Sequence, residues 1–300
     1  MVGMITDIQR FSLNDGPGIR TTVFFKGCDM RCAWCHNPET ISPQRELHYH
    51  SRNCIDCFHC VEVCPVGAHG NRQGKHSFDP ALCIGCGNCA EICYPGAMEM
   101  SGKSMSVQQV MEEILQDKPY YADSGGGVTL SGGEVLCQLP FAVALAKACR
   151  AEGIPVAIET NLNLPFEGMR PLLEQLDLVM CDIKLYDPGA HQKWVGADNS
   201  RVLENVKKLA EAGVPIIVRT PLIPGATDSE ENIGSIAGFL AGAENLRYYE
   251  LLNFNPLGAS KYDSLSRSNP FADARPLPQE KLLALQAVAE ARGVTTRIES

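Results

Sequence analysis

Three cysteines lie close together near the start of the chain, in the stretch GCDMRCAWCHNPET (27–40). Cys28, Cys32 and Cys35 have the spacing of metal ligands, yet no fourth cysteine follows in this stretch. Sites for a tetrahedral metal ion or an iron–sulfur cluster normally use four protein ligands. A cluster held by three cysteines leaves one iron with an open coordination position, as catalytic zinc does. The spacing therefore predicts a cluster that binds a small molecule at its fourth iron.

Eight further cysteines form two runs of C-x2-C-x2-C-x3-C between residues 54 and 93. This repeated spacing is typical of bacterial two-cluster ferredoxins, in which the fourth cysteine of each run binds the neighbouring cluster. A pair of zinc ribbons is the alternative, but ribbons do not use three evenly spaced cysteines plus a fourth. The predicted ligands are Cys54, Cys57, Cys60 and Cys93 for one [4Fe–4S] cluster, and Cys83, Cys86, Cys89 and Cys64 for the other.

The other cysteines and most histidines are not predicted to be ligands. Cys137, Cys149 and Cys181 are scattered, and we expect them to be buried apolar residues. Five histidines fall in or beside the ferredoxin-like segment, and we expect them to lie on a solvated surface. They are His48, His50, His59, His69 and His76.

Around the cysteine-rich segment, strand-like and helical patterns alternate. Strand-like runs occupy 21–27, 127–132, 155–160, 178–184, 215–220 and 248–254, and helical patterns occupy 106–118, 139–153, 200–214 and 278–293. Alternation on this scale predicts an α/β fold with a parallel sheet. Six such units favour a full or partial β/α barrel, with a doubly wound open sheet as the alternative. We predict a first barrel part at 1–47, a ferredoxin-like insert at 48–97 that depends on its metal, and the remaining barrel at 98–300.

Each predicted strand is followed by a polar or glycine-rich motif. The three-cysteine loop follows the first strand, and SGGE (131–134), ETN (159–161), DIK (182–184), RTPLIPG (219–225) and NFNPLG (253–258) follow the others. The carboxyl ends of parallel strands form one edge of a β/α barrel, where active sites are built. The six motifs are therefore predicted to surround a single site.

Charge and hydropathy exclude several classes of protein. The 300 residues carry a formal net charge of −9, which gives no general attraction to nucleic acid or anionic membranes. The start of the chain lacks the apolar run of a signal peptide, and no stretch approaches about 18 apolar residues. Clustered cysteines favour metal binding in a reducing compartment, so we expect a cytoplasmic protein without a membrane partner.

The motifs together resemble the radical S-adenosylmethionine superfamily, and within it the glycyl radical enzyme activating enzymes. The resemblance rests on DGPGIRTTVFFKGC (15–28), WCHNPE (34–39), SGGGVTLSGGE (124–134), DIK (182–184), LIPG (222–225) and ELLNFNPLGASKY (250–262). It implies a radical barrel whose open iron is chelated by the methionyl group of S-adenosylmethionine. One electron would then yield methionine and a 5′-deoxyadenosyl radical, which removes hydrogen from a backbone glycine of a partner glycyl radical enzyme.

The resemblance also implies roles for individual residues. Gly132, Gly133 and Glu134 correspond to the segment that meets the methionyl amine, and Trp34 and His36 flank the last cluster ligand. Asp182 and Lys184 match the D-x-K motif of the family, and Asp182 is implied to help bind a monovalent cation. Asp15 and Arg219 correspond to residues near the incoming glycine loop. Asn255 stands where a histidine commonly meets the ribose.

Some alternatives remain open at this point. Core packing is the alternative explanation for Trp34, and a local salt bridge is the alternative for Asp182 and Lys184. The insert clusters are expected to relay electrons from a flavodoxin or ferredoxin, although docking or fold stability would also explain them. Two other functions compete with activation: radical chemistry on a small molecule, and plain electron transfer.

Overall fold

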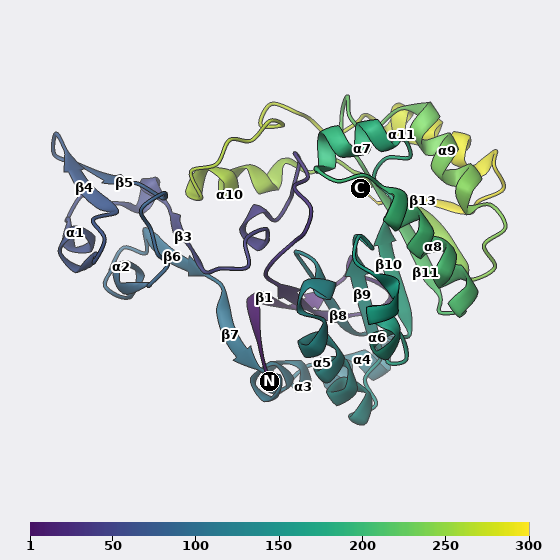
Figure 1. Ribbon diagram of the computed structural model, residues 1–300, viewed down its shortest axis with the longest axis horizontal. Coiled ribbons are helices and arrows are strands. Elements are labelled where there is room, and N and C mark those ends of the chain that lie inside the picture. Colours follow the sequence, from purple (N-terminus) through teal and green to yellow (C-terminus); the bar gives the residue numbers. More distant parts are fainter. Residues whose placement is uncertain (300) are drawn as a thin grey trace.

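The strand-like runs of the sequence form one sheet in the computed structural model, which describes residues 1–299 (Figure 1). The sheet has nine strands in the order β13-β12-β11-β10-β9-β8-β2-β1-β7. Its strands are β1 (Val2–Ser12), β2 (Arg20–Phe25), β7 (Lys103–Ser106), β8 (Gly127–Gly132), β9 (Val156–Thr160), β10 (Leu178–Asp182), β11 (Ile216–Leu222), β12 (Leu246–Asn253) and β13 (Thr296–Glu299). All neighbours from β2 to β13 are parallel, whereas β1 pairs antiparallel with both β2 and β7.

The strand order confirms an α/β fold with a mostly parallel sheet, is the order expected of a partial barrel, and contradicts the doubly wound alternative. A doubly wound sheet reverses its strand order at one point. Here each parallel strand from β2 onward adds to the same side of the previous one. The six predicted strands are therefore consecutive neighbours, and β13 adds a seventh. Within residues 1–299 the edge strands β7 and β13 do not pair with each other, so the barrel is open.

Helices connect the parallel strands and cover the outer face of the sheet (Figure 1). They are α3 (Val107–Leu115), α4 (Lys118–Ser124), α5 (Leu139–Ala151), α6 (Arg170–Leu173), α7 (Pro188–Val195), α8 (Ser200–Ala212), α9 (Glu230–Leu240) and α11 (Gln279–Glu290). A further helix, α10 (Ala259–Ser264), lies away from the sheet and contacts β3 (Glu46–Tyr49). Short 3₁₀ turns occupy Pro38–Thr40, Val135–Gln138, Phe166–Met169 and Pro256–Gly258. At α3, Ser106 and Gln109 form the reciprocal capping box that fixes where the helix begins.

The alternation of side chains along each strand separates an apolar face from a polar one. Val156 and Ile158 of β9 point outward and join the core between sheet and helices, as do Val179 and Cys181 of β10. The intervening positions point to the concave face. There they place apolar residues such as Ala157 and Met180 below and polar residues such as Glu159 above. The fold therefore presents polar side chains to the inside of the open barrel, near the carboxyl ends of its strands.

The glycine-rich loop after β1 packs tightly against the concave face. Gly18 has a φ of +73°, and a Cβ built there would lie 2.5 Å from the backbone nitrogen of Gly126. A Cβ on Gly126 would lie 1.8 Å from the carbonyl oxygen of Ile19. The two loops approach this closely only because both positions lack a side chain. This packing sets Asn14 and Asp15 close to the interior of the barrel.

A small lobe of its own elements extends from the barrel between β2 and β7 (Figure 1). It contains β3 (Glu46–Tyr49) paired antiparallel with β6 (Met98–Ser101), the hairpin of β4 (His69–Arg72) and β5 (Lys75–Phe78), and the short helices α1 (His59–Val63) and α2 (Asn88–Glu91). A 3₁₀ turn covers Ser51–Asn53. The apolar cluster of the lobe has only Leu47, Cys60, Cys89 and Met98 fully buried. Such a core is too small to hold a fold by apolar burial alone.

Two ion pairs, one of them to a buried lysine, join the lobe to the barrel. The Lys26 side chain, at the end of β2, is fully buried, and its Nζ donates to Glu46 Oε2 at 3.0 Å and to the Glu39 carbonyl oxygen. The guanidinium of Arg267, just after α10, pairs with the same Glu46 carboxylate. Burial lowers the pKa of Lys26, and Glu46 opposes that shift. Because a buried cation left without its partner is costly, these pairs fix how the lobe begins.

Two expectations about burial are wrong in part. Cys149 and Cys181 are buried as predicted, but Cys137 is exposed because it lies in the 3₁₀ turn that precedes α5. His48, His69 and His76 are buried rather than solvated. His48 Nδ1 lies 2.7 Å from Ser264 Oγ at the junction with α10, and His69 and His76 contact each other across the β4–β5 hairpin. Over residues 1–299, no helix has both the length and the apolar character that a membrane crossing requires.

Candidate functional site

A cavity of about 630 Å³ opens at the carboxyl edge of the parallel strands. Its size falls in the range of about 300–1,000 Å³ that is usual for cofactor sites. Residues from every motif predicted to surround the site line it, among them Cys28, Gly132, Glu159, Asp182, Ile223 and Asn255. The structure thus brings the six rim motifs together around one space, as their positions after successive strands predict.

All three cysteines of the 27–40 loop line this cavity. Burial raises the pKa of each thiol well above its usual value, to about 12 for Cys35. A metal-free thiol here stays protonated, whereas coordination to a metal deprotonates it. Within residues 1–299 no fourth cysteine lines the cavity. The donor set therefore fits a cluster with three thiolate ligands and one open iron.

The glycines of SGGE are required by close packing against the cysteine loop. Gly132 has a φ of +111°, and a Cβ built on it would lie 2.3 Å from the backbone nitrogen of Phe25. A Cβ on Gly133 would lie 2.4 Å from the carbonyl oxygen of Gly27 and 2.7 Å from that of Thr40. Both glycines line the cavity. They let the end of β8 touch both ends of the cysteine loop, which sets the position of that loop above the sheet.

Glu134 lies behind the cavity rather than in its lining. The side chain is fully buried. Oε1 accepts hydrogen bonds from the Leu136 backbone N–H at 3.0 Å and from Thr160 Oγ1 at 2.8 Å, while Oε2 accepts from the Asn161 N–H at 2.7 Å. Burial raises the pKa of this carboxyl to about 7, and the three donors oppose the shift. The structure thus gives Glu134 a task that the sequence did not suggest, which is to hold the start of the loop after β9.

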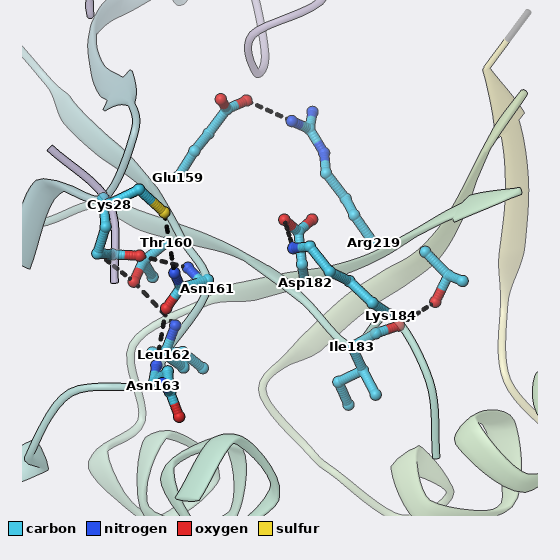
Figure 2. Close-up of polar contacts among 12 residues, drawn as sticks. Cys28, Glu159, Thr160, Asn161, Leu162, Asn163, Asp182, Ile183, Lys184 and Arg219 are labelled. Carbon is cyan, nitrogen blue, oxygen red and sulfur yellow. Dashed lines mark hydrogen bonds and ion pairs between the residues drawn. The ribbon is translucent and has the colours of Figure 1, made fainter. Parts of the chain in front are cut away.

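The D-x-K pair lies in the cavity, as Figure 2 shows. Lys184 Nζ donates to Asp182 Oδ2 at 2.6 Å. Burial alone would lower the pKa of Lys184, but the attraction of the Asp182 carboxylate outweighs it and raises that pKa. The local salt bridge therefore exists, and it stands inside the cavity rather than on the surface. Asp182 remains about one-third exposed, with a side-chain exposure of 34%.

Arg219 is the centre of a buried charge network on the concave face. Its Nε donates to Glu250 Oε2 at 2.7 Å, its Nη1 to Glu159 Oε1, and its Nη2 to the carbonyl oxygen of Asn14 at 3.2 Å. Figure 2 shows the pairing with Glu159. Burial opposes the charge of Arg219, but the two carboxylates outweigh it and raise its pKa. Arg219 does not line the cavity, whereas Glu159 does.

Asp15 lies in a second cavity, of about 500 Å³, beside the first. Asp15 Oδ2 accepts a hydrogen bond from Thr22 Oγ1 at 2.6 Å, and its carbonyl oxygen accepts from Thr129 Oγ1 at 2.6 Å. The two cavities share residues of their linings, including His36, Ser131 and Glu159. The DGPGIR loop therefore borders the site from the side of β1.

Trp34, His36 and Asn255 all line the main cavity. Trp34 also packs edge-on against Phe271, with 6.1 Å between ring centroids, so core packing and a place in the site are both realised. Asn255 is the N-cap of the 256–258 turn, and its Oδ1 accepts a hydrogen bond from the Leu257 N–H at 3.0 Å. The amide oxygen is thus engaged in the turn, which leaves the Nδ2 donor for a ligand.

Each predicted cluster of the insert corresponds to a cavity of its own. One cavity is lined by Cys54, Cys57, Cys60 and Cys93 together with Cys89, and the other by Cys64, Cys83, Cys86 and Cys89. Each predicted set of four cysteines thus borders one cavity, and Cys89 borders both. His69 and His76 also lie near Cys60. One possible ligand atom from each of these three residues lies within 4.8 Å of the other two.

Sequence comparison gives the family. Residues 82–235 match the radical SAM superfamily, and residues 14–63 match a 4Fe-4S single cluster domain. The chain belongs to the radical SAM superfamily. Within it, the chain is 42% identical over 270 residues to the (2S)-3-sulfopropanediol dehydratase activating enzyme of Klebsiella oxytoca, covering 88% of this chain and 85% of that one. It is therefore a member of the activating-enzyme family.

Other relatives of this radical SAM protein agree. The trans-4-hydroxy-L-proline dehydratase activating enzyme of Clostridioides difficile is 39% identical, with 98% of each chain covered. The benzylsuccinate synthase activating enzyme of Thauera aromatica is 39% identical, with 99% of this chain and 92% of that one covered. Among solved structures, a domain of a pyruvate-formate lyase-activating enzyme from Bacteroides vulgatus has a TM-score of 0.50 and 27% identity, and covers 58% of this chain and 99% of that one.

Sequence reasoning missed several residues of this site. The ETN motif gives Glu159 no predicted role, yet Glu159 lines both cavities. Asp29 and Asn161 were not singled out, although Asn161 Nδ2 donates to Asp29 Oδ1 at 2.9 Å beside the cysteine loop. An acidic residue next to the first cysteine and an asparagine directly after a strand were the available signals.

Replacing Asn255 tests its contact with S-adenosylmethionine. We expect Asn255→Ala to raise the dissociation constant about tenfold, the scale of one lost hydrogen bond of about 1.4 kcal/mol. Asn255→Asp is the matched control, because it keeps the oxygen that accepts from Leu257 but loses the Nδ2 donor. Isothermal titration under anaerobic conditions measures both affinities. An unchanged affinity in both variants would show that Asn255 only shapes the turn.

Proposed function

We propose that this protein activates a partner glycyl radical enzyme by removing a hydrogen atom from one of its backbone glycines. An open-iron [4Fe–4S] cluster, when bound, supplies one electron to S-adenosylmethionine, and cleavage yields methionine and the 5′-deoxyadenosyl radical that takes the hydrogen. The observation that carries this proposal is the convergence of three cysteines and five other rim motifs on one cavity. The activating-enzyme relatives support it over small-molecule chemistry and over plain electron transfer.

We assign the residues of the main cavity to the binding of cluster and substrate. Cys28, Cys32 and Cys35 would hold the cluster. Gly132 and Gly133 expose backbone polar groups next to it, where a methionyl ammonium can be accepted. Lys184, which is held by Asp182, supplies a positive charge in the lining of the cavity. Trp34, His36 and Asn255 complete the lining, with the indole face available for stacking on a planar base.

The acidic residues of the cavity support a cation site next to the proposed cluster and S-adenosylmethionine. Asp182 and Glu159 both line the cavity. Asp182 contacts Lys184 through Oδ2, whereas Glu159 accepts from Arg219 and Ser131. Oxygen donors of this kind suit hard cations. We therefore propose that a monovalent cation binds beside Asp182. For Glu134, its burial behind the cavity favours a supporting role over direct contact with the methionyl amine.

The partner's glycine loop is proposed to enter along the second cavity. That cavity contains Asp15 and opens to the main one through shared residues such as Glu159 and Ser131. A chain segment placed there would reach the main cavity without crossing the helices. Arg219 would act from behind the lining, since it contacts this region through the carbonyl oxygen of Asn14 and the carboxylate of Glu159.

We further propose that the insert, 48–97, holds two [4Fe–4S] clusters, which makes three in all. The two cysteine-lined cavities support the crossed ligand sets, because each contains one predicted set of four. The ion pairs of Glu46 with the buried Lys26 and with Arg267 support a fixed placement of the insert beside the cysteine loop. A fixed placement suits electron relay, with a flavodoxin or ferredoxin as donor.

The decisive experiment uses electron paramagnetic resonance on the protein and a cognate glycyl radical enzyme. We expect a glycyl radical doublet after anaerobic reduction with S-adenosylmethionine. A partner enzyme whose radical-site glycine is changed to alanine is the control, and it should show none. Deoxyadenosine release without the doublet, across a panel of candidate partners, would contradict the proposal and favour a small-molecule substrate.

A further inference from the structure

The loop that follows β9 is held rigidly by bonds that the proposed function does not use. Leu162 is fully buried and has a φ of +57°, a backbone conformation that costs about 1–3 kcal/mol in a residue of this type. Its carbonyl oxygen accepts a hydrogen bond from Asn205 Nδ2 at 2.8 Å. Arg201 donates to the carbonyl oxygen of Asn163 at 3.0 Å, and Glu134 accepts from the Asn161 N–H at 2.7 Å. The loop is thus fixed from three sides.

These bonds orient the side-chain amide of Asn161. Its Oδ1 accepts a hydrogen bond from the Asn163 N–H at 2.8 Å, which closes a tight turn and settles which side of the amide carries the nitrogen. The Nδ2 group donates to Asp29 Oδ1 at 2.9 Å and lies 3.8 Å from Cys28 Sγ, within reach of a hydrogen bond to sulfur. Figure 2 shows the amide nitrogen directed at that sulfur. The residue is 7% exposed.

The two hydrogens of this amide match the two acceptors. One serves the Asp29 carboxylate, and the other is left for the Cys28 sulfur. Asp29 also accepts from Asn163 Nδ2 at 2.8 Å through its second oxygen, so the carboxylate joins both asparagines. Once Cys28 is a thiolate in a cluster, the bond to its sulfur becomes charge-assisted and stronger.

We propose that Asn161 sets the reduction potential of the open-iron cluster by donating a hydrogen bond to the Cys28 thiolate. The proposal rests on the cluster assigned to the main cavity in the proposed function. Hydrogen bonds to cluster sulfurs are one of the determinants of the potential. Reduction adds negative charge to the cluster, so an N–H donor stabilises the reduced state more than the oxidised state. Asn161 therefore raises the potential and makes the cluster easier for a biological donor to reduce.

The test compares two asparagine-to-serine variants of the full-length, cluster-loaded protein. Asn161→Ser keeps a hydroxyl oxygen that can accept from the Asn163 N–H, but it is too short to reach Cys28. Asn163→Ser is the matched control, because each change removes one hydrogen bond to Asp29 and only the first removes the bond to sulfur. Redox titration is followed by the paramagnetic signal that changes when S-adenosylmethionine is added, since only the open-iron cluster binds it.

We expect Asn161→Ser to lower the reduced-to-oxidised ratio at a given potential about tenfold, which is about 59 mV for one electron. Asn163→Ser should change that ratio less than twofold. Equal shifts of the reduction potential in both variants would overturn the proposal, because they would show that Asn161 only shapes the loop. An unchanged reduction potential in Asn161→Ser would overturn it as well. If the serine variant retains less iron than the wild type, Asn161→Thr, which keeps the same turn, replaces it. No partner enzyme is needed, so a failure of glycyl radical formation would leave this result intact.

Discussion

Serine at Cys28, Cys32 and Cys35 is expected to abolish cleavage of S-adenosylmethionine under every reductant, because no iron with an open position remains. All three sulfurs line the main cavity, and the described part of that lining offers no fourth cysteine to replace them. Iron content should fall from about twelve per chain to about eight if each cluster has four irons. Iron analysis and measurement of deoxyadenosine with dithionite as reductant test both expectations.

The matched variant carries serine at Cys57 and Cys86, one from each insert cavity. Both residues are exposed, so their replacement removes no side chain from the small core of the lobe. We expect this variant to retain cleavage with dithionite while activation driven by flavodoxin or ferredoxin falls sharply. Full activity with the biological donor would remove the relay role. Loss of cleavage with dithionite in folded protein would show that insert and active site are not separable.

Strand positions could be predicted because each parallel strand is a short apolar run bounded by turn residues. The run at 127–132 coincides with β8, and the other five differ from the observed strands by a few residues. β1 and β7 were missed because their pairing, such as Val2 with Ser106, joins segments about a hundred residues apart. α9 was missed as well. Its interior contains Gly234 and Gly238, which lower helix propensity, and the helix forms because it packs against α11.

The residues that meet at the site could be predicted where they belong to motifs with a recognisable spacing. Successive strand ends had to meet at one edge, and the cavity contains a residue from each of the six motifs. The direction of a side chain does not follow from its motif. Glu134 follows two glycines of the cavity lining, yet its carboxylate turns to Thr160 and Asn161 behind that lining. The bond between Asn161 and Asp29 joins residues 132 apart in sequence, so no local pattern announces it.

The family resemblance and the structure give different expectations for Arg219. Replacing this residue distinguishes a role at the glycine loop from a role in stability. A residue that only meets the glycine loop would affect glycyl radical formation and leave stability unchanged. In the structure Arg219 is buried and joins Glu159 to Glu250, two carboxylates on neighbouring parts of the concave face. Removing a buried partner of this kind costs about 3–5 kcal/mol, because the remaining charges are left uncompensated. We therefore expect Arg219→Met to destabilise the protein by that amount.

The pH dependence of this loss identifies its cause. Burial already raises the pKa of Glu159, and Arg219 opposes that shift, so the pKa should rise further in Arg219→Met. A carboxyl whose pKa is raised in the folded state contributes stability at low pH and loses it as pH rises through the folded pKa. The difference between Arg219→Met and wild type should therefore be smaller at pH 5.5 than at pH 8. Urea unfolding under anaerobic conditions measures this difference in the free energy of unfolding.

Arg219→Lys is the control, because lysine keeps the charge but cannot reach both carboxylates with a planar fork. Its free energy of unfolding should fall between those of wild type and Arg219→Met. A difference in unfolding free energy that does not change with pH would contradict this account of Glu159. Full stability together with lost activation would show that Arg219 acts at the glycine loop.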